Sequence, residues 1–308
     1  MQPAVSAHRR LRDWIGLGTI VILFASGFTL IDITVTTITP LTMTAGRMIL
    51  GTCVLYVWIR ARGQHLPPLR DATGRLSQLW LYFFSLGLVG NVLPNTLIPW
   101  GQREIDSGLA SILVGLMPLM TLGLSALFVK SEQINRHHLA GFGLGFLGII
   151  VLTGPTALGS AGWQSLRHEM AVLGGAFCFA INAILIKRMP PVSPMAASTG
   201  FSICAALIAV PVALVFDAPW TLRPSALSLA GWVLLGLSTA VFAPIVYVKL
   251  IRSAGPTFAA LSNYLVPPLT ISLGFVLLQQ QLDWNAYLAL GLILAGVAIS
   301  QRRRPLKG

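Results

Sequence analysis

Most of this chain consists of long apolar runs separated by short polar stretches. A bilayer core about 30 Å thick needs about 20 apolar residues in each helix that crosses it. The runs therefore predict an all-α integral membrane protein with ten transmembrane helices, of which the fifth and tenth are short. The expected ranges are 14–33, 40–60, 79–100, 106–129 and 138–154, followed by 169–188, 194–216, 226–249, 255–278 and 285–301.

The Lys and Arg residues lie mainly in alternate connections between these runs. With the N-terminus inside, 17 of the 21 fall in cytoplasmic segments, Arg103, Arg167 and Arg223 fall in outer loops, and Arg47 lies within the second span. Cytoplasmic loops of membrane proteins carry an excess of Lys and Arg. Both termini are therefore predicted to be cytoplasmic. A missed helix would scramble the segregation, so it also supports the count of ten.

Composition points to the same class. Only 10% of the 308 residues are charged, 55% are hydrophobic and the mean hydropathy is +0.77, whereas about a quarter of a soluble domain is charged. The net charge of +12 is spread over short clusters between apolar runs, which does not indicate a nucleic-acid partner. The three cysteines lie inside apolar runs and suggest neither a disulfide framework nor a metal site. We expect a multi-pass protein of the inner (plasma) membrane that needs no cofactor.

The second half of the chain repeats the first. A shift of 149 positions aligns residues 116–121 (LMPLMT) with residues 265–270 (LVPPLT). Because each half holds five helices, an odd number, the second half enters the membrane from the opposite side, and the repeats are predicted to be inverted. The expected units are residues 1–155 and 156–308, each with five helices.

Prolines interrupt corresponding helices in the two halves. Pro118 and Pro267 are predicted to do so at equivalent positions, and Pro94 and Pro244 nearly so. Proline removes a backbone donor and kinks a helix, which a membrane tolerates where neighbours or a water-filled cavity satisfy the freed carbonyl. Paired interruptions of this kind point to a transport site, although they are also compatible with a role in packing alone.

Several short motifs follow one another along the chain: Pro40 with Arg47, Gly108-Leu109-Ala110-Ser111, Pro118, Glu132, the glycines at 141, 145 and 148, Ala259-Ala260, Pro267, and Gly291 with Gly296. In their order and spacing they resemble the drug/metabolite transporter superfamily, in its ten-helix branch called the EamA family. The chain departs from the family at Gln279-Gln280-Gln281, where a Gly-Glu pair is usual after the ninth helix, and at Phe24-Ala25-Ser26, where a tryptophan and a small residue are common. The resemblance covers about residues 14–301 and implies export or exchange of a small metabolite by alternating access.

Arg47 is the most informative single residue. A charge inside a span is costly and is expected to face the bundle and to have a partner. One interpretation has Arg47 binding a substrate carboxylate as a bidentate donor. The other has it paired with Asp32, near the outer end of the first helix, which would lock the first two helices together. Asp32 is also the candidate for proton coupling.

Amides and aromatic side chains supply the other candidates for a central cavity. Asn91 and Asn95 are four residues apart and share a helix face, where buried amides need partners from a cavity or from another helix. In the second half, polar side chains at comparable places are Asn182, Asn263 and Tyr264, with Tyr247 as a weaker candidate. Trp100 is expected either to anchor its helix at the membrane interface or to close the outer mouth.

We therefore predict a secondary transporter that exports an amino acid or a related zwitterion or anion. Alternatives are an exporter of organic cations and a membrane sensor or scaffold that transports nothing. No nucleophile–base or metal cluster is predicted at membrane depth, which argues against an enzyme, and no phosphate-binding loop indicates direct use of ATP. The expected partners are a small-molecule substrate and the lipid bilayer, with a homodimer possible.

Overall fold

The structural elements of the protein are helices, apart from an isolated β-bridge between Arg70 and Leu76, in the residues that its computed structural model describes, which are 11–70, 74–128, 136–153, 162–254, 256–259 and 261–300. The first half contains α1 (Leu11–Val35), α2 (Pro40–Ala61), α3 (Gln78–Gly87), the π-helical η1 (Leu88–Val92), α4 (Leu93–Gly101), α5 (Ser107–Val114), α6 (Met117–Phe128) and α7 (Arg136–Thr153). The second contains α8 (Gly162–Arg188), α9 (Pro194–Phe216), the short 3-10 helix η2 (Pro219–Thr221), α10 (Ala226–Leu235), the π-helical η3 (Gly236–Phe242), α11 (Ala243–Ala254), α12 (Pro256–Ala259), α13 (Ser262–Leu278) and α14 (Trp284–Ser300).

The predicted membrane segments are present. Six helices of the described residues are long and apolar enough to cross a membrane, and four shorter apolar helices bring the number to ten. The all-helical, ten-segment fold class is therefore confirmed. The sixth segment begins earlier than expected, because α8 starts at Gly162 and includes Arg167. The predicted boundary at 155/156 and Glu132 lie outside the described residues.

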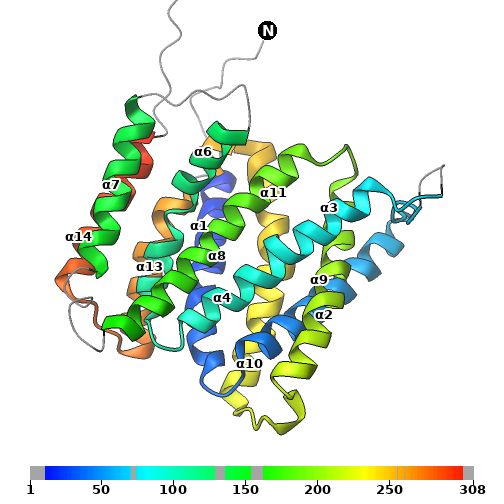
Figure 1. The fold of residues 1–308 in the computed structure, drawn as a ribbon, viewed down its shortest axis with the longest axis horizontal. Helices are drawn as coiled ribbons and strands as arrows, with labels where there is room; N and C mark the ends of the chain where they lie inside the picture. Colours follow the sequence, from blue (N-terminus) through cyan, green and yellow to red (C-terminus); the bar gives the residue numbers. More distant parts are fainter. Residues whose placement is uncertain are drawn as a thin grey trace, which may run out of the picture.

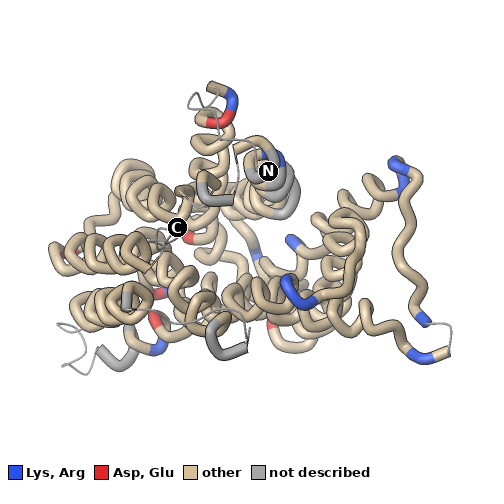
Figure 2. Tube along the Cα trace, turned by 90° about the horizontal axis from the view of Figure 1, so that it is seen from above, with Lys and Arg blue, Asp and Glu red and all other residues tan. Residues whose placement is uncertain are grey.

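Two pairs of equivalent helices hold the halves together. α7 packs along α14, and α2 packs along α9, as the two most extensive helix pairings of the described chain. These pairs lie at opposite edges of the molecule, with α1 and α8 between them (Figure 1). Each pair joins a helix of the first repeat to its counterpart in the second, as expected for repeats related by a twofold axis in the membrane plane. Seen from above, the tubes carry few charged residues (Figure 2).

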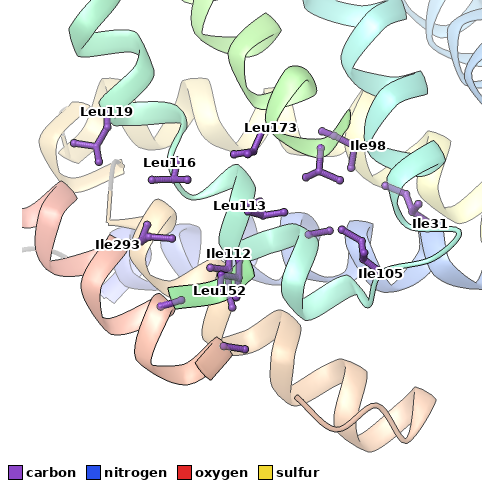
Figure 3. Packing of buried hydrophobic residues seen from close by; sticks show 14 of the residues in the cluster. Ile31, Ile98, Ile105, Ile112, Leu113, Leu116, Leu119, Leu152, Leu173 and Ile293 are labelled. Atoms are coloured by element: carbon purple, nitrogen blue, oxygen red, sulfur yellow. The ribbon is translucent and has the colours of Figure 1, made fainter. Parts of the chain in front are cut away.

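An apolar core joins the two halves beside the α7–α14 pair. Ile112 and Leu113 of α5 are fully buried there against Leu152 of α7 and Ile293 of α14 (Figure 3). The same cluster reaches Ile31 near the end of α1. This core fixes α5, a short helix from the broken fourth segment, against both repeats.

Glycine allows α7 and α14 to approach backbone to backbone. A Cβ atom added to Gly141 would lie 2.6 Å from the carbonyl oxygen of Gly296, and one added to Gly296 would lie 2.7 Å from that of Gly141. Small residues at such interfaces let membrane helices pack by van der Waals contact, which replaces the hydrophobic driving force that is absent in lipid. The contact is thus specific to glycine at both positions.

We expect Gly141→Leu to lower the stability of the protein in detergent by about 1–3 kcal/mol, because the added side chain must push the two backbones apart. Gly143→Leu is the matched control, because a Cβ atom at Gly143 meets nothing within 4 Å. Thermal unfolding followed by the loss of monodisperse protein measures both variants. Equal melting temperatures for the two would contradict the close approach of α7 and α14.

Candidate functional site

The third and eighth membrane segments share an unusual feature. In each, a π-helical stretch ends two residues before a proline: η1 precedes Pro94, and η3 precedes Pro244. The wider turn of a π-helix is rare and is often found at functional sites. The nearly equivalent prolines of the third and eighth helices thus mark a matching pair of irregular segments.

The fourth and ninth segments are broken, but not at equivalent positions. The first break falls at Gly115 and Leu116, and Pro118 is the second residue of the helix that follows. In the second half, Leu261 stands in a turn, and Pro267 lies inside the continuous helix α13. The prediction that Pro118 and Pro267 interrupt their helices at equivalent positions is therefore wrong, because α13 accommodates its prolines within the helix.

One backbone carbonyl freed by proline is satisfied by a side chain from another helix. Pro99 lies inside α4 and has no N–H group for the carbonyl of Asn95, four residues before it. That carbonyl instead accepts a hydrogen bond from Thr44 Oγ1 on α2, and Thr96 Oγ1 donates to the Thr44 hydroxyl at 3.3 Å. These hydrogen bonds fix α2 against α4.

Arg47 of α2 is buried against η3. Its side chain is only 6% exposed, and Nη2 donates to Thr239 Oγ1 at 2.8 Å. Nε and Nη1 are also buried and have no hydrogen-bond partner in the described part of the protein. A desolvated guanidinium with two unused donors is costly, and a bidentate acceptor such as a carboxylate would satisfy it.

Asp32 does not pair with Arg47. Its carboxylate accepts hydrogen bonds from Gln102 Nε2 (2.6 Å), Gln280 Nε2 (2.7 Å) and the backbone N–H of Ser107 (3.0 Å). The predicted lock between the first two helices is therefore not formed. Asp32 instead joins α1 to the turn between α4 and α5 and to the residues after α13.

Two further contacts complete this group of residues, which we call the Asp32 cluster (Asp32, Gln102, Ser107 and Gln280). Ser107 Oγ donates to Gln280 Oε1 at 2.9 Å, and Gln102 Nε2 also donates to the carbonyl of Phe28 at 2.9 Å. Ser107 and Gln102 are buried, whereas Arg103 in the turn between them is exposed. We call the end of the bundle that holds this turn the α4–α5 end.

Arg47 and Asn91 lie at the same depth in the bundle. Thr44 of α2 contacts Asn95 of α4, and the next turn of α2 packs with η1 in one apolar cluster. α2 and η1–α4 therefore run in opposite directions, so Arg47, three residues after Thr44, lies at the level of Asn91. The Asn91 amide donates to the carbonyl of Leu86 at 3.2 Å, within its own helix.

Asn182 of α8 reaches the same level from the other side. It lies against η1 so closely that a Cβ atom at Gly90 would collide with its Oδ1. We call Arg47, Asn91, Asn182 and Thr239 the polar layer. Both π-helical segments contribute to it, since Asn91 belongs to η1 and Thr239 to η3.

The remaining candidates lie around this layer or away from it. Asn95 is one turn from Asn91, and its amide donates to the Asn91 carbonyl at 2.7 Å. Tyr247 of α11 packs near Phe24 with ring centroids 6.4 Å apart. Trp100 stacks on His168 with ring centroids 4.4 Å apart, near the end of α4; whether it anchors the helix or closes a mouth stays a prediction.

Asn263 and Tyr264 are not brought to the polar layer. They lie in the first turn of α13, whose other end leads to Gln280 of the Asp32 cluster. Fifteen residues of helix correspond to about 22 Å. Asn263 is therefore far from the α4–α5 end, whereas Gly27, which contacts Thr239 of the layer, is only five residues from Asp32 on α1.

Sequence reasoning missed Thr239, Gln102, Ser107 and Gln280. The partners of Asp32 come from positions 70 to 248 residues away, and single Ser, Thr and Gln residues give no periodic signal. The run Gln279-Gln280-Gln281 was visible as a departure from the family pattern, and Gln280 proves to be the member of the cluster that comes from the second repeat.

Comparison with known proteins decides the family. Residues 14–154 and residues 167–301 each match the EamA-like transporter family. The chain belongs to this family. It is accordingly a membrane transporter by family, with the two-repeat architecture that the sequence predicted.

Individual relatives of this EamA-like chain are also named as transporters or exporters. It is 27% identical over 285 residues to the uncharacterized inner membrane transporter YedA of Escherichia coli K12, which covers 90% of this chain and 87% of the relative. It is 26% identical to a probable terminal-alkyne amino-acid exporter of Streptantibioticus cattleyicolor, over 70% of this chain and 71% of the relative. It is 22% identical to the S-adenosylmethionine/S-adenosylhomocysteine transporter of Chlamydia trachomatis, over 89% and 84%. The family match and the name of YedA place this EamA-like protein in the inner membrane.

Proposed function

We propose that this EamA-like transporter exports a small solute that carries a carboxylate, an amino acid or a related zwitterion or anion, by alternating access. The observation that carries the proposal is Arg47, buried at 6% exposure with Nε and Nη1 unpaired among the described residues. Asn91 and Asn182 lie at the same level of the bundle as Arg47, and their amides offer further hydrogen bonds. A solute carboxylate would supply what the guanidinium lacks.

The surroundings of Asp32 support the choice of solute. A site for an organic cation needs a carboxylate that is free to receive it. The carboxylate of Asp32 is instead occupied by three donors. Two of the relatives are named for solutes that contain an amino-acid group, which agrees with an acceptor of carboxylates. Coupling to protons through Asp32 and export toward the outside, with both termini cytoplasmic, remain parts of the proposal.

Flux in proteoliposomes tests the proposal. The purified protein is assayed with amino acids, each against its own carboxamide, and with organic anions and cations. We expect the amino acids or anions to be transported, and the carboxamides, which keep the ammonium group but lack the carboxylate, to be carried at least tenfold more slowly. Equal rates for an acid and its carboxamide would contradict the role of Arg47. Lack of flux for every compound would favour a sensor or scaffold.

A further inference from the structure

The Asp32 cluster joins three parts of the molecule at one end of the bundle. Asp32 belongs to α1, Gln102 and Ser107 flank the turn between α4 and α5, and Gln280 follows α13. The site is closely packed. A Cβ atom at Gly274 of α13 would lie 2.6 Å from Gln280 Oε1 and 3.2 Å from Ser107 Oγ. A side chain at residue 274 would therefore have to displace the Gln280 amide from its present position.

The helix–helix contacts at the two ends of the bundle differ, as a comparison of equivalent helices in the two repeats shows. α1 contacts α4 and α5 of its own half, and α5 contacts α13. The counterpart of α1 is α8, which in the described residues makes no comparable contact with α11, α12 or α13. Inverted repeats would make both sets of contacts if the two halves had the same conformation. The structure is therefore closed at the α4–α5 end and less closed at the other.

We infer that the Asp32 cluster is the gate of this transporter at the α4–α5 end, with the Gln280 amide as the bond that connects the second repeat to it. This inference rests on the proposed function only in supposing that the two ends open in turn. Opening this end separates Asp32 from Gln280 and from the N-terminus of α5, and it exposes the polar layer to that side of the membrane.

Gln280 suits the gate because its amide has both a donor and an acceptor. Nε2 donates to Asp32 Oδ2, and Oε1 accepts from Ser107 Oγ. A glutamate at this position would place a second carboxylate, without a donor, against Asp32. Two carboxylates at hydrogen-bond distance stay together only by sharing a proton, and they repel each other once both are ionised. Gln280→Glu is therefore expected to open the gate at alkaline pH, where neither carboxylate holds the proton.

The experiment uses a reporter cysteine in the polar layer. In the full-length protein with Cys53, Cys178 and Cys204 replaced by alanine, Thr239→Cys is labelled with a membrane-impermeant thiol reagent in intact cells and in inside-out vesicles. A separate Arg103→Cys variant identifies the preparation that exposes the α4–α5 end, since Arg103 lies exposed in that turn.

At alkaline pH, where both carboxylates are ionised, we expect Gln280→Glu to raise the labelling rate of residue 239 from the α4–α5 end at least tenfold and to lower it from the opposite end. Gln281→Glu is the matched control: it adds the same charge at an exposed neighbour and should change neither rate. Gln280→Ala removes the bond without adding a charge and should shift both rates in the same directions as Gln280→Glu, which keeps the test decisive if the glutamate variant does not fold.

Labelling from the α4–α5 end that is the same in Gln280→Ala and Gln281→Glu would overturn the gate. Because labelling requires no solute, the two proposals fail separately. A protein whose gate responds but which carries no carboxylate solute refutes the proposed function alone. A protein that carries such a solute while the labelling rates stay unchanged refutes the gate alone.

Discussion

Replacing Arg47 with methionine is expected to reduce the flux of the carboxylate solute about a hundredfold, while the protein remains folded. Removing one partner of a buried, hydrogen-bonded charge pair costs about 2–5 kcal/mol, and about 2.7 kcal/mol corresponds to a hundredfold change. Among the described residues, however, the Arg47 side chain donates only to Thr239. We therefore expect the melting temperature of Arg47→Met to equal or exceed that of the parent protein.

The combination of the two measurements separates the two interpretations of Arg47. A structural residue would lose stability and flux together, whereas a solute-binding residue loses flux alone. Arg60→Met is the matched control, because Arg60 belongs to the same helix but is exposed in its last turn. A large fall in the melting temperature of Arg47→Met, with the control unchanged, would show that Arg47 holds the fold.

A disulfide between residues 107 and 274 is expected to stop transport reversibly. A Cβ atom at Gly274 lies 3.2 Å from Ser107 Oγ, which is close to what the fixed geometry of a disulfide requires. In the cysteine-free background, Ser107→Cys with Gly274→Cys should lose at least nine-tenths of its flux on oxidation, because α5 and α13 can no longer separate, and a reductant such as dithiothreitol should restore it.

A second disulfide controls for the effect of cross-linking itself. Thr52 of α2 and Ser202 of α9 have hydroxyl oxygens 2.9 Å apart, in a pair of equivalent helices that packs along its length. Thr52→Cys with Ser202→Cys should retain flux on oxidation. Full flux through an oxidised 107–274 pair, with the disulfide shown to be formed, would mean that the α4–α5 end need not open.

The placement of the helices was predictable because it depends on local properties. Hydropathy alone gave ten segments, and α2 and α9 begin and end within a residue of the expected ranges. The internal repeat indicated two halves of five helices. The start of α8 was misplaced, since the segment around Arg167 and His168 is too polar for a hydropathy window, although His168 is buried by its stack on Trp100.

The site was predictable only in part. A buried arginine is visible in any sequence of apolar runs, so Arg47 was identified, as was Asn91 from the spacing of amides on one helix face. The partner of Arg47 was not identified. Asp32 was the candidate because it is near in sequence, but the hydrogen-bond partners of both residues lie in distant segments. In the sequence, only Pro94 and Pro244 indicated irregular segments at the places of the two π-helices.

The sequence by itself therefore determined the spans and the presence of a costly charge at membrane depth, since both follow from transfer of side chains between water and lipid, and the two-fold repeat, since the two halves align with each other. Only the tertiary structure decided that Asp32 bonds to Gln102, Ser107 and Gln280 and that Arg47 has two donors without a partner among the described residues. Hydrogen bonds act over about 3 Å, so which polar groups meet depends on how the helices pack, and helix packing in lipid is set by shape rather than by any periodic pattern in the chain.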